Sequence, residues 1–216
     1  MALDLAAFAR IRPYAYHLTS TANLPSILEA RRIDCAATLI LKDGRNELLR
    51  RRRSKHELLR VDGRNIWLRD QAPLHQGNLV LSGGWSFPDL VKALNERVFF
   101  WPGTEAGPND YGHRHFNRYV VEAPVLIRVK TSELLDGNGA SAAEFCRYNS
   151  GSPRYSGGRP SPRGPDTFVS AASFHWSPSN VIELVFRESA TLPSSLEFAT
   201  KPIGPWRAFG HRAPGG

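Results

Sequence analysis

Two polar side chains near the start of the chain have a spacing that could bind a sugar and a phosphate. His17 and Thr19 lie at the end of an apolar segment, and a polar turn and a helical pattern follow them. A ring nitrogen, a hydroxyl and the free amides of a helix N-terminus would then lie close together, which suits a ribose and a phosphate. An isolated pair of this kind is more often a satisfied strand-end histidine and a local cap.

A single carboxylate, Glu183, lies inside the apolar run 181–186. Because burying a charge is costly, such a residue either points outward from a half-buried strand or is held in a cleft for a purpose. For one glutamate considered alone, the outward position is the usual one. A position in a cleft would make Glu183 a candidate for charge stabilisation or proton transfer.

Arginine is concentrated in two segments. Residues 42–64 carry nine Lys or Arg against four Asp or Glu, and the run 50–53 lies inside this segment. Residues 147–163 carry four Arg and no acidic residue. Most charge runs are solvated faces, and some of these arginines must be exposed.

The charge of the whole chain favours a polyanionic partner. The formal net charge is +8 and the isoelectric point is about 9.9, which fits DNA, RNA or an acidic membrane surface. Apolar runs such as 98–101 fall far short of the roughly 20 residues needed to cross a bilayer, and no secretory signal pattern opens the chain. We therefore expect a soluble cytoplasmic protein without a membrane span.

Cysteine and histidine give no spacing typical of a metal site. Cys35 and Cys146 stand among core-type neighbours, so we expect buried, reduced thiols. His113 and His115 lie in a polar, loop-like stretch, and no histidine combines with cysteines or acids at ligand spacing. We expect no bound metal.

The segment 16–28 resembles the N-terminal signature of the DarT family, the NAD-dependent DNA ADP-ribosyltransferase toxins. That signature is Tyr-His-x-Thr followed by Asn-Leu-x-x-Ile-Leu, and His17, Thr19 and Asn23 match it at the family's spacing. The resemblance implies that NAD is a co-substrate. It also implies that His17 and Thr19 contact the ADP-ribose portion and that Asn23 fixes either the turn or the ligand.

The segment around Glu183 resembles the late strand that carries the catalytic glutamate of the same family, which reads Ala-Glu-x-Leu-Val. The resemblance makes Glu183 the catalytic carboxylate. It would stabilise the positive charge that develops on the ribose as nicotinamide leaves, and accept the proton of an attacking base nitrogen. Position 181 is Val, whereas arginine-modifying ADP-ribosyltransferases usually carry a second carboxylate there, so an arginine acceptor is disfavoured.

The resemblance also implies an active-site arginine, a few tens of residues after the histidine motif. Arg53 is our choice for this catalytic role, with Arg52 as the close competitor. Either would clamp the NAD phosphates or assist the base. Arg69, at a predicted strand end, could instead supply this cofactor-binding function or simply pair with Asp70.

The stretch 149–166 is dominated by Gly, Pro, Ser and Arg and should form a long exposed loop. It precedes Glu183 much as a substrate-recognition loop does in ADP-ribosyltransferases. Arginine for phosphates and tyrosine for base stacking would suit single-stranded DNA or RNA. The candidate nucleic-acid contacts are Arg154, Tyr155, Arg159 and Arg163. A plain linker would explain the composition equally well.

Hydrophobic periodicity predicts the elements that must position these residues. Helices are expected at 24–28, 46–59, 89–95 and 131–135, and strands at 14–18, 65–68, 97–101, 119–130, 167–174 and 181–186. This order predicts an α+β domain with a largely antiparallel sheet and helices mainly in the N-terminal half. The resemblance makes the fold ADP-ribosyltransferase-like. One domain should span 1–216, with a frayed end over 201–216.

The sequence thus predicts a mono-ADP-ribosyltransferase that modifies a nucleobase of DNA or RNA. By analogy with the family it would be a toxin or a phage-defence effector, with an antitoxin or a reversing hydrolase as a possible partner. An NAD glycohydrolase or a protein-modifying transferase is the alternative within the same fold. A non-catalytic, basic nucleic-acid-binding module is the alternative from a different class.

Overall fold

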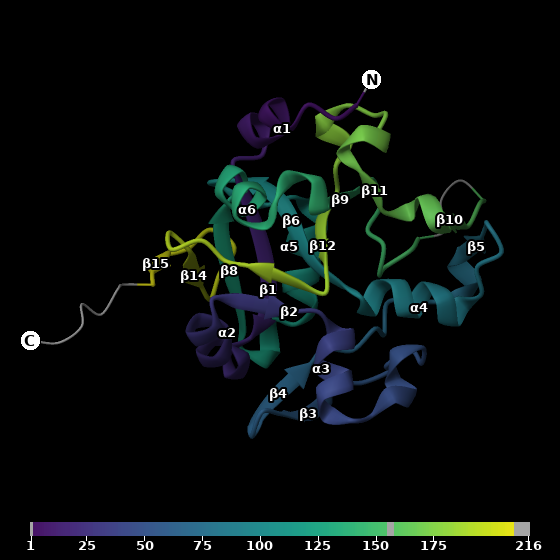
Figure 1. Ribbon diagram of the computed structural model, residues 1–216, viewed down its shortest axis with the longest axis horizontal. Coiled ribbons are helices and arrows are strands. Elements are labelled where there is room, and N and C mark those ends of the chain that lie inside the picture. The colour runs from purple at the N-terminus through teal and green to yellow at the C-terminus, as the bar shows by residue number, and fades with distance from the viewer. Residues whose placement is uncertain (1, 155–157, 210–216) are drawn as a thin grey trace, which may run out of the picture.

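The computed structural model describes residues 2–154 and 158–209 (Figure 1). The α-helices are α1 (Leu5–Ile11), α2 (Leu24–Ala30), α3 (Ala36–Asp43), α4 (Phe87–Asn95), α5 (Asp110–Arg118) and α6 (Thr131–Asn138). Short 3-10 helices are η1 (Thr21–Asn23), η2 (Asn46–Leu49), η3 (Gln76–Asn78), η4 (Val120–Glu122), η5 (Ala140–Ala142), η6 (Pro165–Thr167), η7 (Ala171–Ser173) and η8 (Pro178–Asn180).

Most strands join one large sheet. The strands are β1 (Tyr14–Ser20), β2 (Arg32–Asp34), β3 (Glu57–Val61), β4 (Arg64–Leu68), β5 (Leu79–Leu81), β6 (Arg97–Thr104), β7 (Gly107–Pro108), β8 (Pro124–Lys130), β9 (Ala143–Cys146), β10 (Ser161–Arg163), β11 (Val169–Ser170), β12 (Glu183–Arg187), β13 (Ser189–Thr191), β14 (Glu197–Ala199) and β15 (Arg207–Ala208). The large sheet has the order β11-β9-β12-β6-β1-β8-β14-β15, and β7 pairs with β6. Its pairings are antiparallel. The predicted α+β class with a mostly antiparallel sheet is confirmed.

The centre of this sheet opens between β1 and β6. β1 pairs with β8 from end to end, but it pairs with β6 only where 14–16 face 101–103. Beyond Tyr16 the two strands separate. The His17 side chain lies at this point, with Nδ1 2.9 Å from the carbonyl oxygen of Phe99. The imidazole of His17 therefore bonds the Phe99 carbonyl in place of a main-chain N–H of β1. This leaves a gap between β1 and β6 near the middle of the sheet.

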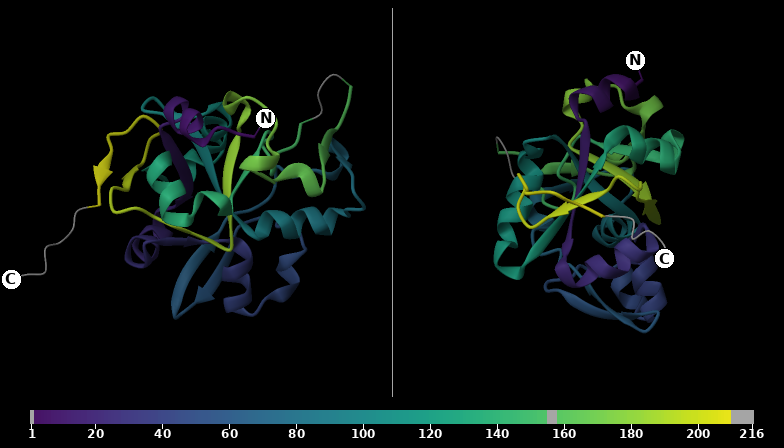
Figure 2. Two further views of the ribbon diagram at one scale, coloured as in Figure 1. Left: turned by 45° about the horizontal axis from the view of Figure 1, so that its top comes forward. Right: turned by 90° about the vertical axis from the view of Figure 1, so that its left-hand side faces the viewer.

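Apolar side chains fill both faces of the sheet. The largest core cluster includes Phe8 of α1, Phe100 of β6, Leu134 of α6 and Leu184 of β12. On the other face, α4 packs against Val185. α5 packs against Tyr16, Trp101 and Leu126. Helices thus cover both faces of the sheet, and Figure 2 gives two further views of this arrangement.

The hairpin β3–β4 forms a separate small core with α3 and η2. Leu59 and Ile66 point inward to Ile40 and Leu48, whereas Leu58 is exposed. The predicted helix over 46–59 is therefore wrong beyond η2. Alternate burial favours a strand, and the turn Asp62–Gly63, with φ of 50° and 78°, closes a two-residue hairpin. The strand predicted at 65–68 is confirmed.

Two further expectations are corrected by local structure. The stretch containing His113 and His115 is the helix α5, because Asn109 caps it by accepting bonds from the main-chain N–H groups of Tyr111 and Gly112. The strand expected over 119–130 begins only at Pro124, since η4 and the positive φ of Ala123, 49°, come first.

The strand expected over 167–174 is reduced to β11. The 3-10 turns η6 and η7 flank β11, and Thr167 accepts a bond from the main-chain N–H of Gly164. Near the C-terminus, β15 pairs with β14 and the ring of Trp206 lies 5.6 Å from that of Tyr16. The described part of 201–216 thus lies against the body.

The two cysteines, Cys35 and Cys146, are both buried and free, as predicted. Among the helices that the structure describes, none is both long enough and apolar enough to span a bilayer.

Asn23 ties the hairpin to β1. Its Oδ1 accepts the N–H of Trp67 at 2.9 Å, and its Nδ2 donates to the Trp67 carbonyl at 2.8 Å. We predict that Asn23→Ala lowers the free energy of unfolding by roughly 1–3 kcal/mol, because two main-chain groups lose their partner. Urea unfolding checks this. The exposed Asn65→Ala serves as the control, and equal effects of both changes would contradict the tie.

Candidate active site

A cavity of about 840 Å³ lies at the gap between β1 and β6. Its walls come from β1, α2, the hairpin, the end of α4, α5, residues 149–152 and the start of β12. It brings together the predicted catalytic and cofactor-binding residues His17, Thr19, Asn23, Arg53, Arg69 and Glu183. The fold therefore collects on one surface six side chains that are far apart in the sequence.

Glu183 is the first residue of β12 and is only 3% exposed. Its Oε1 accepts the main-chain N–H of Ser150 at 3.1 Å, while its Oε2 is enclosed without a hydrogen-bond partner among the described residues. Burial raises the pKa of Glu183 to about 7, against the bonds from Ser150 and the charge of Arg163, which lower it. This carboxyl can therefore gain or lose a proton near neutral pH, and one oxygen is available to a ligand.

Arg163 does not make the exposed contact that was expected of it. It is fully buried in β10, which pairs with β5, and its guanidinium donates to the carbonyls of Asn149, at 2.8 Å, and Ser150, at 3.3 Å. Those carbonyls belong to the segment that supplies the Ser150 N–H to Glu183. Arg163 therefore fixes the main chain that orients the carboxylate.

The other candidate nucleic-acid contacts of the 149–166 loop do not reach the cavity in the described part of the chain. Arg154 and Arg159 are exposed and do not line the cavity, and Tyr155 lies outside the described residues. Within the stretch predicted to be exposed, Ser150 and Arg163 are buried. The loop is thus anchored inside the protein at its two ends.

His17 is neutral. Burial lowers the pKa of its imidazole to about 4, and the charge of Arg69 adds to this, although the bond to Phe99 raises it. Because Nδ1 must carry the proton to donate to the Phe99 carbonyl, Nε2 is an unprotonated acceptor. His17 can therefore accept a hydrogen bond from a ligand hydroxyl or amide.

Arg69 is a cation without a carboxylate partner among the described residues. Its guanidinium lies 4.1 Å from the centre of the Tyr119 ring, and its Nη1 is enclosed without a hydrogen bond. Burial lowers the pKa of Arg69. The neighbouring Asp70 is occupied instead by the hydroxyl of Tyr119 and the N–H of Ala72. An enclosed guanidinium donor in this position suits an anionic ligand.

Arg53 is buried, and the main chain positions it beside Arg69. It donates to the Arg69 carbonyl at 3.0 Å and to Oδ1 of Asn95 at 2.8 Å. Burial lowers the pKa of Arg53 to about 10, opposed by Glu57 and Asp70. Arg52 instead donates to the carbonyls of Gln71 and Ala72 and does not line the cavity. Of the two competitors, Arg53 is the one that reaches the site.

Thr19 and Asn23 are coupled to each other. Nδ2 of Asn23 donates to Oγ1 of Thr19 at 3.2 Å, as well as to Trp67. The amide of Asn23 is thus used to fix the wall of the cavity, which agrees with the first of its two expected roles. The hydroxyl of Thr19 accepts one bond and keeps its own hydrogen for another partner.

Sequence reasoning missed three residues of the cavity. The His115 ring lies between Trp101, with ring centres 4.7 Å apart and tilted, and Tyr119, at 5.0 Å in an edge contact. Burial lowers the pKa of His115 to about 3, and the charges of Arg69 and Arg118 add to this. The i, i+4 spacing of His115 and Tyr119 on one helical face was a usable signal. Ser150, which lies in a Gly- and Ser-rich stretch, gave none.

In the described ranges, no group of three or more His, Cys, Asp or Glu side chains is arranged to hold a metal ion. The buried charged and ring groups described above are one carboxyl, two arginines and two neutral imidazoles. Such a donor set suits an anionic ligand with sugar hydroxyls.

Comparison with family models gives one match. The model described as "Family of unknown function (DUF7002)" matches residues 13–194, which is most of the chain. The chain belongs to this family. The match includes the His17 strand, the hairpin and the Glu183 strand. Searches of curated proteins and of solved structures find no match to this DUF7002 member.

The raised pKa of Glu183 predicts a pH-dependent stability. Between the ordinary value of 4.5 and about 7, the folded state binds more protons than the unfolded state. The free energy of unfolding therefore falls as pH rises through this window, by up to roughly 3 kcal/mol. Urea unfolding at about pH 5 and about pH 8 should show this loss in the wild type but not in Glu183→Gln. The exposed Glu188→Gln should behave like the wild type.

The position of Arg163 predicts an effect on Glu183 at a distance. Arg163→Met removes a nearby cation and loosens Ser150, so the pKa of Glu183 should rise further. A carboxyl titration by carbon NMR, with the Glu183 signal assigned by its loss in Glu183→Gln, measures this. Arg159→Met, an exposed change in the same loop, should leave the titration unchanged. A Glu183 titration unaffected by Arg163→Met would refute the proposed orientation.

Proposed function

We propose that this DUF7002 protein is an NAD-consuming ADP-ribosyltransferase with Glu183 as its catalytic carboxylate. One observation carries the proposal: an enclosed carboxyl with a free oxygen, a neutral imidazole and an unpaired guanidinium line the same cavity. Transfer of ADP-ribose needs a stabiliser for a ribose cation, acceptors for ribose or amide groups, and donors for a diphosphate. An ADP-ribosyltransferase-like fold is part of this proposal.

The sheet register gives the scale of the site. Leu184 faces Phe100, so continuing the register by one residue sets Glu183 beside Trp101, and Trp101 faces Tyr16 across the next pair of strands. Two strand spacings of about 4.8 Å separate the main chain of Glu183 from β1 by about 10 Å. β6 lies between the two strands in the sheet, so a ligand that contacts both Glu183 and His17 must cross β6 where the cavity adjoins Phe99 and Trp101.

In the proposed reaction, the bond between ribose C1′ and the nicotinamide nitrogen breaks, and nicotinamide leaves with the electron pair. Ionised Glu183 stabilises the resulting positive charge on the ribose. A nitrogen of the acceptor then bonds to C1′ and its proton passes to Glu183. Arg53 and Arg69 hold the diphosphate, and Nε2 of His17 accepts a hydrogen bond from the ribose or the amide of the substrate.

A nucleobase is the acceptor that the chain supports best. The net charge of +8 favours a nucleic acid over other acceptors. Val181, two residues before Glu183, is buried and apolar, where arginine-modifying enzymes usually carry a second carboxylate. These two features support transfer to DNA or RNA rather than to a protein arginine.

Incubation with isotopically labelled NAD and separate pools of DNA, RNA and protein tests the proposal. We predict that the wild type consumes NAD and that Glu183→Gln is slower by roughly 10²- to 10⁴-fold, because charge stabilisation and proton acceptance are lost together. Glu188→Gln, an exposed change five residues later, should retain full activity. Label on a nuclease-sensitive product identifies nucleic acid as the acceptor.

Other outcomes discriminate between the alternatives. Release of free ADP-ribose in every pool would indicate an NAD glycohydrolase, and label on protein would indicate a protein-modifying enzyme. The activity should also rise with pH through about 7, because only the ionised carboxylate stabilises the ribose cation. A wild type that consumes no NAD in any pool would rule out the enzymatic proposal.

A further inference from the structure

The outer face of the hairpin carries exposed apolar side chains at a place where the inner face is fully packed. Leu58 and Trp67 face each other across β3 and β4, and Trp67 is 45% exposed. Their neighbours Leu59 and Ile66 are buried against α3. An exposed tryptophan paired with an exposed leucine contributes nothing to this core, so its position is open to a partner.

Two contacts join the hairpin to neighbouring segments. The amide of Asn23 bonds the main chain of Trp67, and His56, just before β3, bonds Glu122 of η4 at 2.6 Å. η4 thus adjoins the start of β3. We define the hairpin surface as the exposed residues Leu58, Arg60, Asn65 and Trp67.

The segment that contains the hairpin is rich in basic residues. Residues 42–64 hold nine basic and four acidic side chains, of which Arg50, Arg51 and Arg64 are in ion pairs and Arg53 is buried. The acids at 43, 57 and 62 are each in an ion pair. Arg60 contacts only Asn65 through its side chain, at 3.4 Å, and Lys55 is exposed; in the described ranges neither forms an ion pair. These cations remain available to an anionic partner.

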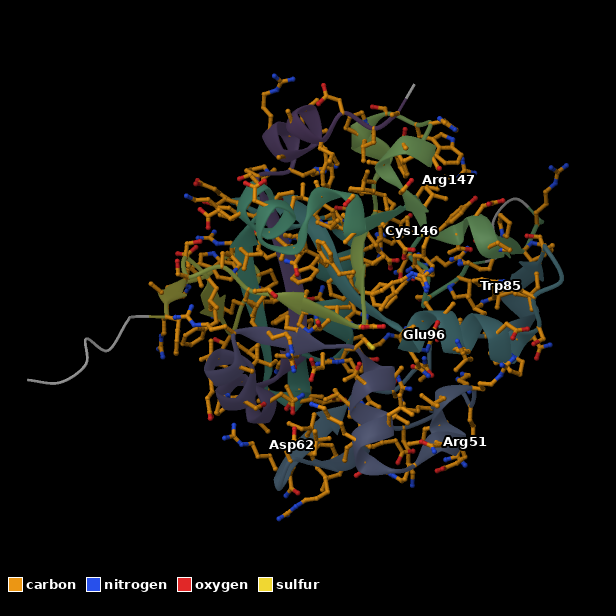
Figure 3. All side chains as sticks on the ribbon, in the orientation of Figure 1. Arg51, Asp62, Trp85, Glu96, Cys146 and Arg147 are labelled. Carbon is orange, nitrogen blue, oxygen red and sulfur yellow. The ribbon has the colours of Figure 1, made fainter. Side chains whose placement is uncertain are left out.

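The hairpin reaches the candidate active site. Trp67 and Arg64 line the same cavity as Glu183. The hairpin lies at one end of the molecule with Asp62 at its tip, and α1 lies at the opposite end (Figures 1 and 3). A strand bound along the outer face would therefore pass the cavity.

We propose that the hairpin surface binds single-stranded nucleic acid. Trp67 stacks on an unpaired base, Leu58 adds apolar contact, and Arg60 and Lys55 bind the phosphates. A duplex fits less well because its base faces are covered. The role of the bound strand as the acceptor rests on the proposed function, but binding itself does not.

Fluorescence anisotropy with a labelled oligothymidylate of about 12 nucleotides, and with a duplex of equal length, tests this on the full chain. The wild type should bind the single strand more tightly. Trp67→Ala should weaken binding by roughly 5- to 100-fold, and Trp67→Phe, which keeps a stacking ring, should restore most of it. The matched control is Trp176→Ala, another tryptophan that is 42% exposed but packs against Phe174.

A charge variant gives a second readout. Arg60→Glu should weaken binding and reduce the salt slope of log affinity by about one, whereas the exposed Arg10→Glu on α1 should do neither. Arg60 does not line the cavity, so Arg60→Glu should leave NAD consumption without acceptor unchanged. If the wild type binds the oligonucleotide but consumes no NAD, the binding proposal is supported and the proposed enzymatic function is rejected.

Three results would overturn the proposal. One is equal weakening by Trp67→Ala and Trp176→Ala. The other is normal binding by Trp67→Ala and Arg60→Glu together with lost binding by a double Arg154→Glu, Arg159→Glu variant, which would assign the strand to the 149–166 loop. Absence of any oligonucleotide binding by the wild type would also reject it.

Discussion

The bond from His17 to the carbonyl of Phe99 is the interaction on which the candidate site depends. It replaces a main-chain pair in the middle of the sheet, so β1 and β6 separate without leaving that carbonyl unsatisfied. The cavity lies in the space gained. The same bond sets the tautomer of His17 and leaves Nε2 as a hydrogen-bond acceptor. One hydrogen bond therefore determines both the opening of the sheet and the acceptor that His17 presents to the cavity.

Burial gives this cavity its electrostatic character. Two imidazoles stay neutral, one carboxyl titrates near neutral pH, and two guanidiniums stay charged with carbonyl or aromatic partners in place of acids. Arg69 therefore lies in the cavity wall without a direct ion pair among the described residues, although the charges of Glu122 and Asp70 act on it. A bound anion would give its enclosed Nη1 a hydrogen-bond partner.

The sequence was informative where a single segment determines its own structure. The apolar runs gave β6 and β12, and the polar turn after His17 gave η1 and α2. The sequence did not reveal which strands pair over long range or where their pairing ends. Nothing in the segment 14–20 reveals that pairing with β6 stops at Tyr16, and the composition of 149–166 conceals the burial of Arg163. The adjacent leucines at 58 and 59 fitted a helix as well as a strand, and only the pairing of β3 with β4 distinguishes the two.

The anchoring of the 149–166 loop affects how this protein can diversify. Arg163 binds the carbonyls of residues 149 and 150, so both ends of the intervening segment are held, while Arg154 and Arg159 between them are exposed and do not line the cavity. Closing a longer loop adds little entropy cost. Insertions or exchanges between the two held ends can therefore accumulate among relatives without displacing the carboxylate.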